Sequence, residues 1–244
     1  MDDKNREYQD ALADIITAKP HEFTVGRKHL RLYPVTLAKM HMVRPYMDAL
    51  EINQKLFSLN PHYEVLRAVS KHRKEVCSAL SIHTSPNSYR ELFNAQAFST
   101  RRNLLDKASD EDLATLLLVV LSSDKTEQVI GYLGLDKESE RKVKIMRIKG
   151  KSKNSIQFGG LSVFGSFIGQ LKEMGYTDDE ILYERPYAFL RLMLADKTLS
   201  VYLTDEELQN ISVDDGGNMI DGNEAGSFDK LKSVLAGKHI KLNE

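Results

Sequence analysis

The sequence has little of what covalent cross-links, thiolate metal sites or membrane spans require. Its 244 residues include a single cysteine, Cys77, so no intramolecular disulfide and no zinc site of several thiolates can form. No apolar run reaches the roughly 18 residues that are needed to cross a membrane. The opening residues, MDDKNREYQD, hold no apolar stretch typical of a secretory signal. We therefore expect a protein of a reducing cytosol that has no membrane partner.

The charge balance leaves no excess of one sign. With 34 basic and 35 acidic residues the formal net charge is −1, so no overall attraction to nucleic acid or anionic membranes is expected. The basic run 141–153 is a local exception, because it contains no acidic residue and could bind phosphates. It also has no aromatic residue to stack on bases. We interpret it as a solvated connector and do not expect nucleic acid as a partner; a nucleic-acid-associated protein is the alternative function that this run suggests.

Motifs that carry chemistry are also missing. The seven histidines show no i, i+4 pair, and the sequence contains no nucleophile elbow, Walker loop or dinucleotide fingerprint. The stretch that begins at Asp221 resembles a calcium loop, but Lys232 stands where that loop needs a bidentate glutamate. Acidic clusters lie at expected helix starts, where carboxylates complement the helix dipole. We therefore expect no catalytic residue, no metal site and no cofactor.

Hydrophobic periodicity predicts a mainly α fold. Phe23, Val25, Leu30 and Leu32 alternate around a glycine-bearing turn, which is typical of a β-hairpin and is the only clear strand signal in the sequence. Elsewhere apolar residues recur at three and four positions, as on one face of a helix, and this spacing predicts about seven to nine helices. The expected fold is a helical bundle with an N-terminal β-hairpin and a flexible C-terminal tail.

Capping signals place several helix starts. Thr36 is expected to cap a helix that Pro45 bends or splits. The run 141–153 fits neither period, so a strand, a helix end and a loop all remain open there. Capping boxes open two further helices, at Ser109 with Asp112 and at Thr177 with Glu180.

Two helices are expected to begin at a cap residue followed by proline, where the missing N–H costs nothing. Asn60-Pro61 predicts a helix whose inward residues extend to Leu80. Ser85-Pro86 predicts a second helix that extends to Leu104. In the second helix we expect Tyr89, Leu92, Phe93 and Leu104 to face the core and Arg101 and Arg102 to face solvent.

The sequence divides into four regions. Residues 1–20 form an N-terminal helix or tail, and residues 21–211 hold the hairpin and the helical domain. Residues 212–227 are rich in glycine and aspartate, which is typical of a flexible linker. Residues 228–244 are expected to contain a short amphipathic helix, too short to be stable alone, which must dock on this chain or on another one.

Two segments resemble a known family. EFTVGRKHLRLYPVTLAKM, a hairpin followed directly by a capped helix, is similar to the opening of the tail assembly chaperones of long-tailed bacteriophages. FGGLSVFGSFIGQLKEMGYTDDEILYERPYAFLRLMLAD resembles the end of their helical domain, through the break formed by Gly175, Tyr176, Thr177, Glu180 and Ile181. The resemblance covers residues 21–52 and 158–196.

The resemblance implies a non-catalytic adaptor. Such chaperones bind the long, hydrophobic tape measure protein in the cytoplasm of the bacterial host, keep it soluble and recruit tail tube subunits around it. Many carry a C-terminal extension that contacts the tube protein, and residues 228–244 would suit that role. A structural component of the phage tail or neck is a further alternative, and homo-oligomers are compatible with either function.

Candidate partner-binding residues follow from this role. A helix bound in a groove is recognised through aliphatic and aromatic anchors, with no reactive group. In the helical domain the candidate anchors are Phe164, Phe167, Tyr176, Tyr187 and Met193. In the C-terminal segment they are Phe228, Leu231 and Leu235. For each of the first five, the alternative is an ordinary place in the hydrophobic core.

Overall fold

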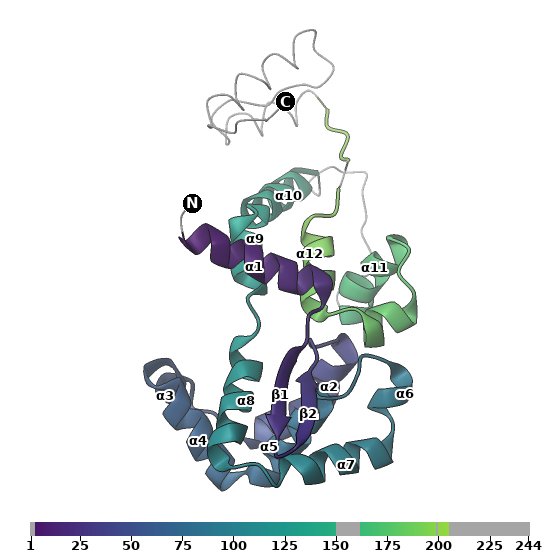
Figure 1. Ribbon diagram of the computed structural model, residues 1–244. Helices are drawn as coiled ribbons and strands as arrows, with labels where there is room; N and C mark the ends of the chain where they lie inside the picture. Colours follow the sequence, from purple (N-terminus) through teal and green to yellow (C-terminus); the bar gives the residue numbers. More distant parts are fainter. Residues whose placement is uncertain (1–2, 150–161, 199, 205–244) are drawn as a thin grey trace, which may run out of the picture. The chain divides into compact units, whose positions relative to one another are not determined.

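The computed structural model describes residues 3–149, 162–198 and 200–204 (Figure 1). The chain divides into two compact units, one of residues 1–139 with 158–198 and the other of residues 140–157 with 199–244. The mainly α fold with an N-terminal hairpin is confirmed. The expected linker 212–227 and C-terminal segment 228–244, with Phe228, Leu231 and Leu235, lie outside the described residues.

The described part of the chain holds more helices than the sequence predicts, partly because two expected long helices are each divided. The helices are α1 (Asp3–Thr17), α2 (Leu37–Ala49), α3 (Gln54–Leu59), α4 (Pro61–Lys71), α5 (Arg73–His83), α6 (Tyr89–Leu92), α7 (Ala95–Leu105), α8 (Asp110–Ser122), α9 (Thr126–Tyr132), α10 (Leu135–Lys149), α11 (Gly169–Glu173) and α12 (Tyr187–Ala195). Two π-helical segments, η1 (Phe164–Ile168) and η2 (Glu180–Glu184), lie before α11 and α12.

The predicted hairpin is present as β1 (His21–Val25) and β2 (Lys28–Leu32), which pair antiparallel. Gly26 in the connecting turn has φ +59°, a conformation that glycine adopts without strain. Val25 and Leu32 are buried against the helices, while most of the other strand residues are exposed. The alternation seen in the sequence therefore separates the packed face of the hairpin from its solvent face.

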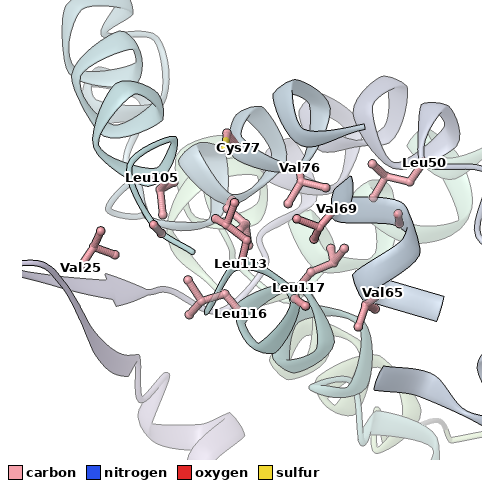
Figure 2. Close-up of a cluster of buried hydrophobic side chains, with 14 of the residues drawn as sticks. Val25, Leu50, Val65, Val69, Val76, Cys77, Leu105, Leu113, Leu116 and Leu117 are labelled. Carbon is pink, nitrogen blue, oxygen red and sulfur yellow. The ribbon is translucent and has the colours of Figure 1, made fainter. Parts of the chain in front are cut away.

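The larger hydrophobic core of the first unit lies among α4, α5 and α8 (Figure 2). Val65 and Val69 of α4, Val76 of α5, and Leu113 and Leu117 of α8 are all completely buried. Burial of each such side chain contributes roughly 1.5–3 kcal/mol to the free energy of unfolding. This layer of helices is thus a main source of the stability of the unit.

The predicted caps of α2, α8 and the segment after Gly175 are confirmed. The backbone N–H of Lys39 donates to Thr36 Oγ1 at 3.4 Å, and α2 continues unbroken through Pro45, so Pro45 does not split the helix. The N–H of Asp112 donates to Ser109 Oγ at 3.1 Å. At the later box, the N–H of Thr177 donates to Glu180 Oε2 at 3.0 Å, and the N–H of Glu180 returns a bond to Thr177 Oγ1 at 3.3 Å.

Two of the expected long helices are wrong in extent. Asn60 caps α4 as predicted, but the helix ends at Lys71, and α5 starts only after His72. No helix begins at Pro86; Ser88 caps α6 and Asn94 caps α7.

Of the orientations expected in the second of these helices, those of Leu92, Leu104 and Arg102 are confirmed, and three others are wrong. Tyr89 and Phe93 are exposed instead of facing the core, and the Arg101 side chain is only 15% exposed instead of facing solvent. The Ser85 hydroxyl has other partners: it donates a hydrogen bond to the Glu91 carbonyl at 3.1 Å and accepts one from Arg101. Ser85 therefore makes a tertiary contact and does not cap a helix.

The basic run is helical as far as it is described. Residues 141–149 form the second half of α10. Of the strand, helix end and loop that the sequence left open, this part of the run is therefore the end of a helix. Lys151 and Lys153 lie outside the described residues.

Candidate functional site

The two segments that carry the family resemblance meet in a second hydrophobic cluster of the first unit. Leu37 of α2 is buried together with Leu171 of α11, Ile181 of η2 and Leu190 of α12. A backbone hydrogen bond from the N–H of Tyr187 to the Val35 carbonyl, 2.7 Å long, joins the same segments. These two segments, which lie far apart in the sequence, thus pack against each other.

The five candidate anchors of the helical domain differ in their surroundings. Phe167, Tyr176 and Tyr187 are partly buried against this cluster, with the rings of Phe167 and Tyr187 5.3 Å apart between centroids. Met193 is partly buried on α12. Phe164 is 73% exposed. Three of the five therefore help to build the cluster, and Phe164 alone among them keeps most of its surface accessible.

The π-helical turn at η1 explains one glycine of this region. The N–H of Gly169 donates to the Phe164 carbonyl, the i to i−5 bond of a π-helix. A Cβ atom at position 169 would lie 3.2 Å from that carbonyl oxygen, closer than most side chains tolerate. Glycine at position 169 therefore avoids a close contact within the π-helical turn.

A cavity of about 900 Å³ opens beside the junction of the two segments. It is bordered by α1, the connection from β2 to α2, the end of α8 and the start of α12. We call its buried and partly buried lining the floor, which includes Leu32, Tyr33, Val35, Met40, His83 and Tyr187. Exposed side chains of α1 and of the α8–α9 connection, including Glu7, Asp10, Asp14 and Asp124, form the rim. The volume lies within the range of ligand sites in proteins.

A fully buried lysine lies directly behind this floor. Lys39 Nζ donates to the Ser85 carbonyl at 2.5 Å and lies 5.3 Å from the centroid of the Tyr33 ring. Burial, and secondly the charge of Arg101, lower the pKa of Lys39 to about 7. No sequence pattern predicts this environment, because the partners of Lys39 come from segments far away in the chain.

Arg101 adds a second cation to the same region. Its Nη2 donates to Ser85 Oγ at 3.1 Å, and its Nη1 lies 3.9 Å from Glu91 Oε2. Its Nε is buried and has no hydrogen-bond partner among the described residues. Burial lowers the pKa of Arg101, and the nearby Glu91 opposes that shift. Lys39 and Arg101 are thus two neighbouring cations, and of these Arg101 is paired with the Glu91 carboxylate.

His83, the last residue of α5, is a buried polar residue of the floor. It is 3% exposed, and it lines the cavity. Burial, followed by the charge of Lys39, lowers its pKa to about 3, so the imidazole is neutral at physiological pH. A neutral imidazole can therefore donate one hydrogen bond to a group inside the cavity.

The described residues offer neither a metal site nor a reactive thiol. Among them, no group of three or more His, Cys, Asp or Glu side chains could hold a metal ion. Within the same ranges, no helix is long and apolar enough to cross a membrane. Cys77 is buried, and burial followed by the charge of Asp106 raises its pKa to about 11, so the thiol is protonated at neutral pH.

Comparison with known proteins supplies no relative. No family model, no curated protein and no solved structure matches the chain. The function must therefore be inferred from the geometry of the described residues and from the resemblance of the two segments that meet at Leu37.

Proposed function

We propose that the chain is a non-catalytic tail assembly chaperone of a long-tailed bacteriophage. In this role it binds and solubilises the tape measure protein in the cytoplasm of the bacterial host and recruits tail tube subunits. The observation that carries the proposal is the packing of the hairpin-to-helix segment 21–52 against the segment 158–196. Both segments resemble the same family, and they share a hydrophobic cluster and the 2.7 Å bond from Tyr187 to Val35.

Accessible apolar surface near this junction supports the proposal. A chaperone that keeps a hydrophobic helical client soluble needs apolar anchors and grooves that are free to receive it. Phe164 supplies an exposed aromatic ring, and the cavity beside α12 supplies an apolar floor. We assign client binding to these two features, and contact with the tube protein to residues 228–244.

The test is co-expression with the tape measure protein encoded in the same phage genome. The expected result is that the client is soluble and co-purifies with the chain, and that it precipitates when expressed alone. Phe164→Ser should reduce the co-purified fraction. Leu59→Ser is the matched control, because Leu59 is also an exposed apolar residue, 83% accessible, but lies on α3. If the client shows no co-purification and no gain in solubility, the proposal is wrong.

A further inference from the structure

The buried charges around Lys39 are not balanced. Lys39 is fully buried, and its ammonium group is stabilised by a neutral carbonyl, that of Ser85. The neighbouring cation is Arg101, whose Nη1 lies 3.9 Å from Glu91 Oε2. Glu91 is the only carboxylate among these residues. Transfer of a charged group out of water costs free energy unless an opposite charge compensates for it. A second carboxylate near Lys39 would supply that compensation.

The cavity offers a place for this carboxylate. Its floor contains Tyr33, whose ring centroid lies 5.3 Å from Lys39 Nζ, and His83, whose imidazole is neutral and can donate a hydrogen bond. A carboxylate at the floor would accept a hydrogen bond from the neutral imidazole and would feel the charge of Lys39 through a low-dielectric wall. Much of the rest of the floor, including Leu32, Val35 and Met40, is apolar.

The rim does not oppose such a group, because much of its acidic charge is compensated. Glu7 is paired with Lys125 at 2.8 Å, and Asp14 is paired with Lys19 at 3.8 Å. The rim residues are exposed and therefore screened by water and salt, unlike the buried charges behind the floor.

We propose that this cavity binds a carboxylate carried on an apolar body, with His83 as the hydrogen-bond donor and Lys39 as the compensating charge. In the assembly proposed above, on which this assignment of the occupant depends, the carboxylate is an acidic side chain on an apolar helix of the client. The groups that face Lys39 are Tyr33 before α2, His83 of α5 and Arg101 of α7, which is itself paired with Glu91 of α6. Because Lys39 loses its proton near neutral pH, binding of the carboxylate weakens as the pH rises.

The chemistry of the site is tested with octanoate, using octan-1-ol as a probe with the same chain but no charge. Binding to the full chain is measured by titration calorimetry between pH 6 and pH 9. Octanoate is expected to bind at least about tenfold more tightly than octan-1-ol at pH 6, and to lose most of this advantage by pH 9. Lys39→Met should remove both the advantage and the pH dependence. Equal binding of the two probes, or octanoate binding that Lys39→Met leaves unchanged, would overturn the proposal.

The occupant is tested by filling the cavity. Ala188→Trp places a large side chain in the cavity lining, and Thr115→Trp places the same side chain on the exposed face of α8 as the control. Thermal unfolding of both variants shows whether they are folded. Only Ala188→Trp is expected to lose octanoate binding and to lose the client. If the client binds Ala188→Trp as it binds the wild type, the occupant assigned here is wrong and the chaperone proposal stands. If the wild type binds no client, the chaperone proposal fails, and the octanoate titration still decides the chemistry of the site.

Discussion

The buried Lys39 predicts that the protein becomes more stable as the pH rises above neutrality. The pKa of Lys39 is about 7 in the folded protein, compared with 10.5 for an unperturbed lysine. Between these two values the unfolded chain binds more protons than the folded chain, so the free energy of unfolding increases with pH. The destabilisation that results from burying the Lys39 charge is fully present below pH 7, and it disappears as the pH approaches 10.5.

The magnitude follows from the difference between the folded and unfolded pKa values of Lys39. A tenfold change in the acid dissociation constant corresponds to about 1.4 kcal/mol, so the change in pKa from 10.5 to about 7 is worth at most about 5 kcal/mol. Because Lys39 is completely buried, screening by solvent does not reduce this value. Removal of the charge-assisted hydrogen bond to the buried Ser85 carbonyl would cost about 1.5–3 kcal/mol, which is less than this value. Charge burial should therefore dominate the effect of Lys39→Met below about pH 7.

The measurement is urea unfolding of the wild type and of Lys39→Met, followed by circular dichroism at several pH values from 6 to 10. Methionine keeps an unbranched apolar chain but carries no charge. Lys39→Met should be more stable than the wild type at pH 6, and this difference should shrink by about 3–5 kcal/mol by pH 10. The comparison removes the contribution of the titrating groups that do not interact with Lys39. If the difference between the two proteins stays constant within about 1 kcal/mol over this range, Lys39 does not titrate as its burial implies.

Four further predictions concern the core, a cap, the thiol and the virion. Leu117→Ala in the buried face of α8 should lower the free energy of unfolding by about 2–5 kcal/mol, while Thr115→Ala on the exposed face should change it by less than about 0.5 kcal/mol, both measured by urea unfolding. Ser109→Ala removes the acceptor for the Asp112 N–H and should cost about 1 kcal/mol in the same assay; an unchanged midpoint would show that this cap contributes nothing. The buried Cys77 thiol should react with iodoacetamide at pH 8 far more slowly in the native protein than in urea, and equal rates would contradict its burial. Mass spectrometry of purified phage particles should not detect the chain, whereas detection at stoichiometric levels would favour a structural tail or neck component.

The sequence predicted well those parts of the fold that depend on local signals. The hairpin was predicted because alternating apolar residues flank Gly26, and both features act within a few residues. The capping boxes at Ser109 and Thr177 were predicted for the same reason, since the bonded atoms are three residues apart. Such elements depend on their own sequence more than on the rest of the chain.

Features that depend on distant contacts could not be predicted in this way. The Ser85 hydroxyl bonds with the Glu91 carbonyl and with Arg101, so the residue that looked like a helix cap is part of a tertiary network. The Lys39 ammonium group can be buried because the Ser85 carbonyl, 46 positions later in the chain, accepts its hydrogen bond. No local pattern reports such a partner, and for this reason the polar part of the candidate site was missed.

The surroundings of the candidate anchors could not be predicted from local patterns either. Phe164 and Phe167 were both predicted as candidate anchors, yet the first is exposed and the second packs on the cluster around Leu171. The π-helical turn of η1 changes the angular positions of the residues within it, and spacing that assumes 3.6 residues per turn does not account for this change.

Whether this chain keeps a tape measure protein soluble can be decided by a sedimentation assay. The tape measure protein of the same phage is produced with and without the chain, and its fraction in the supernatant is measured after high-speed centrifugation. We expect a mostly soluble client in the presence of the wild type and a mostly sedimented client in its absence. An equally sedimented client under both conditions would contradict the proposed function.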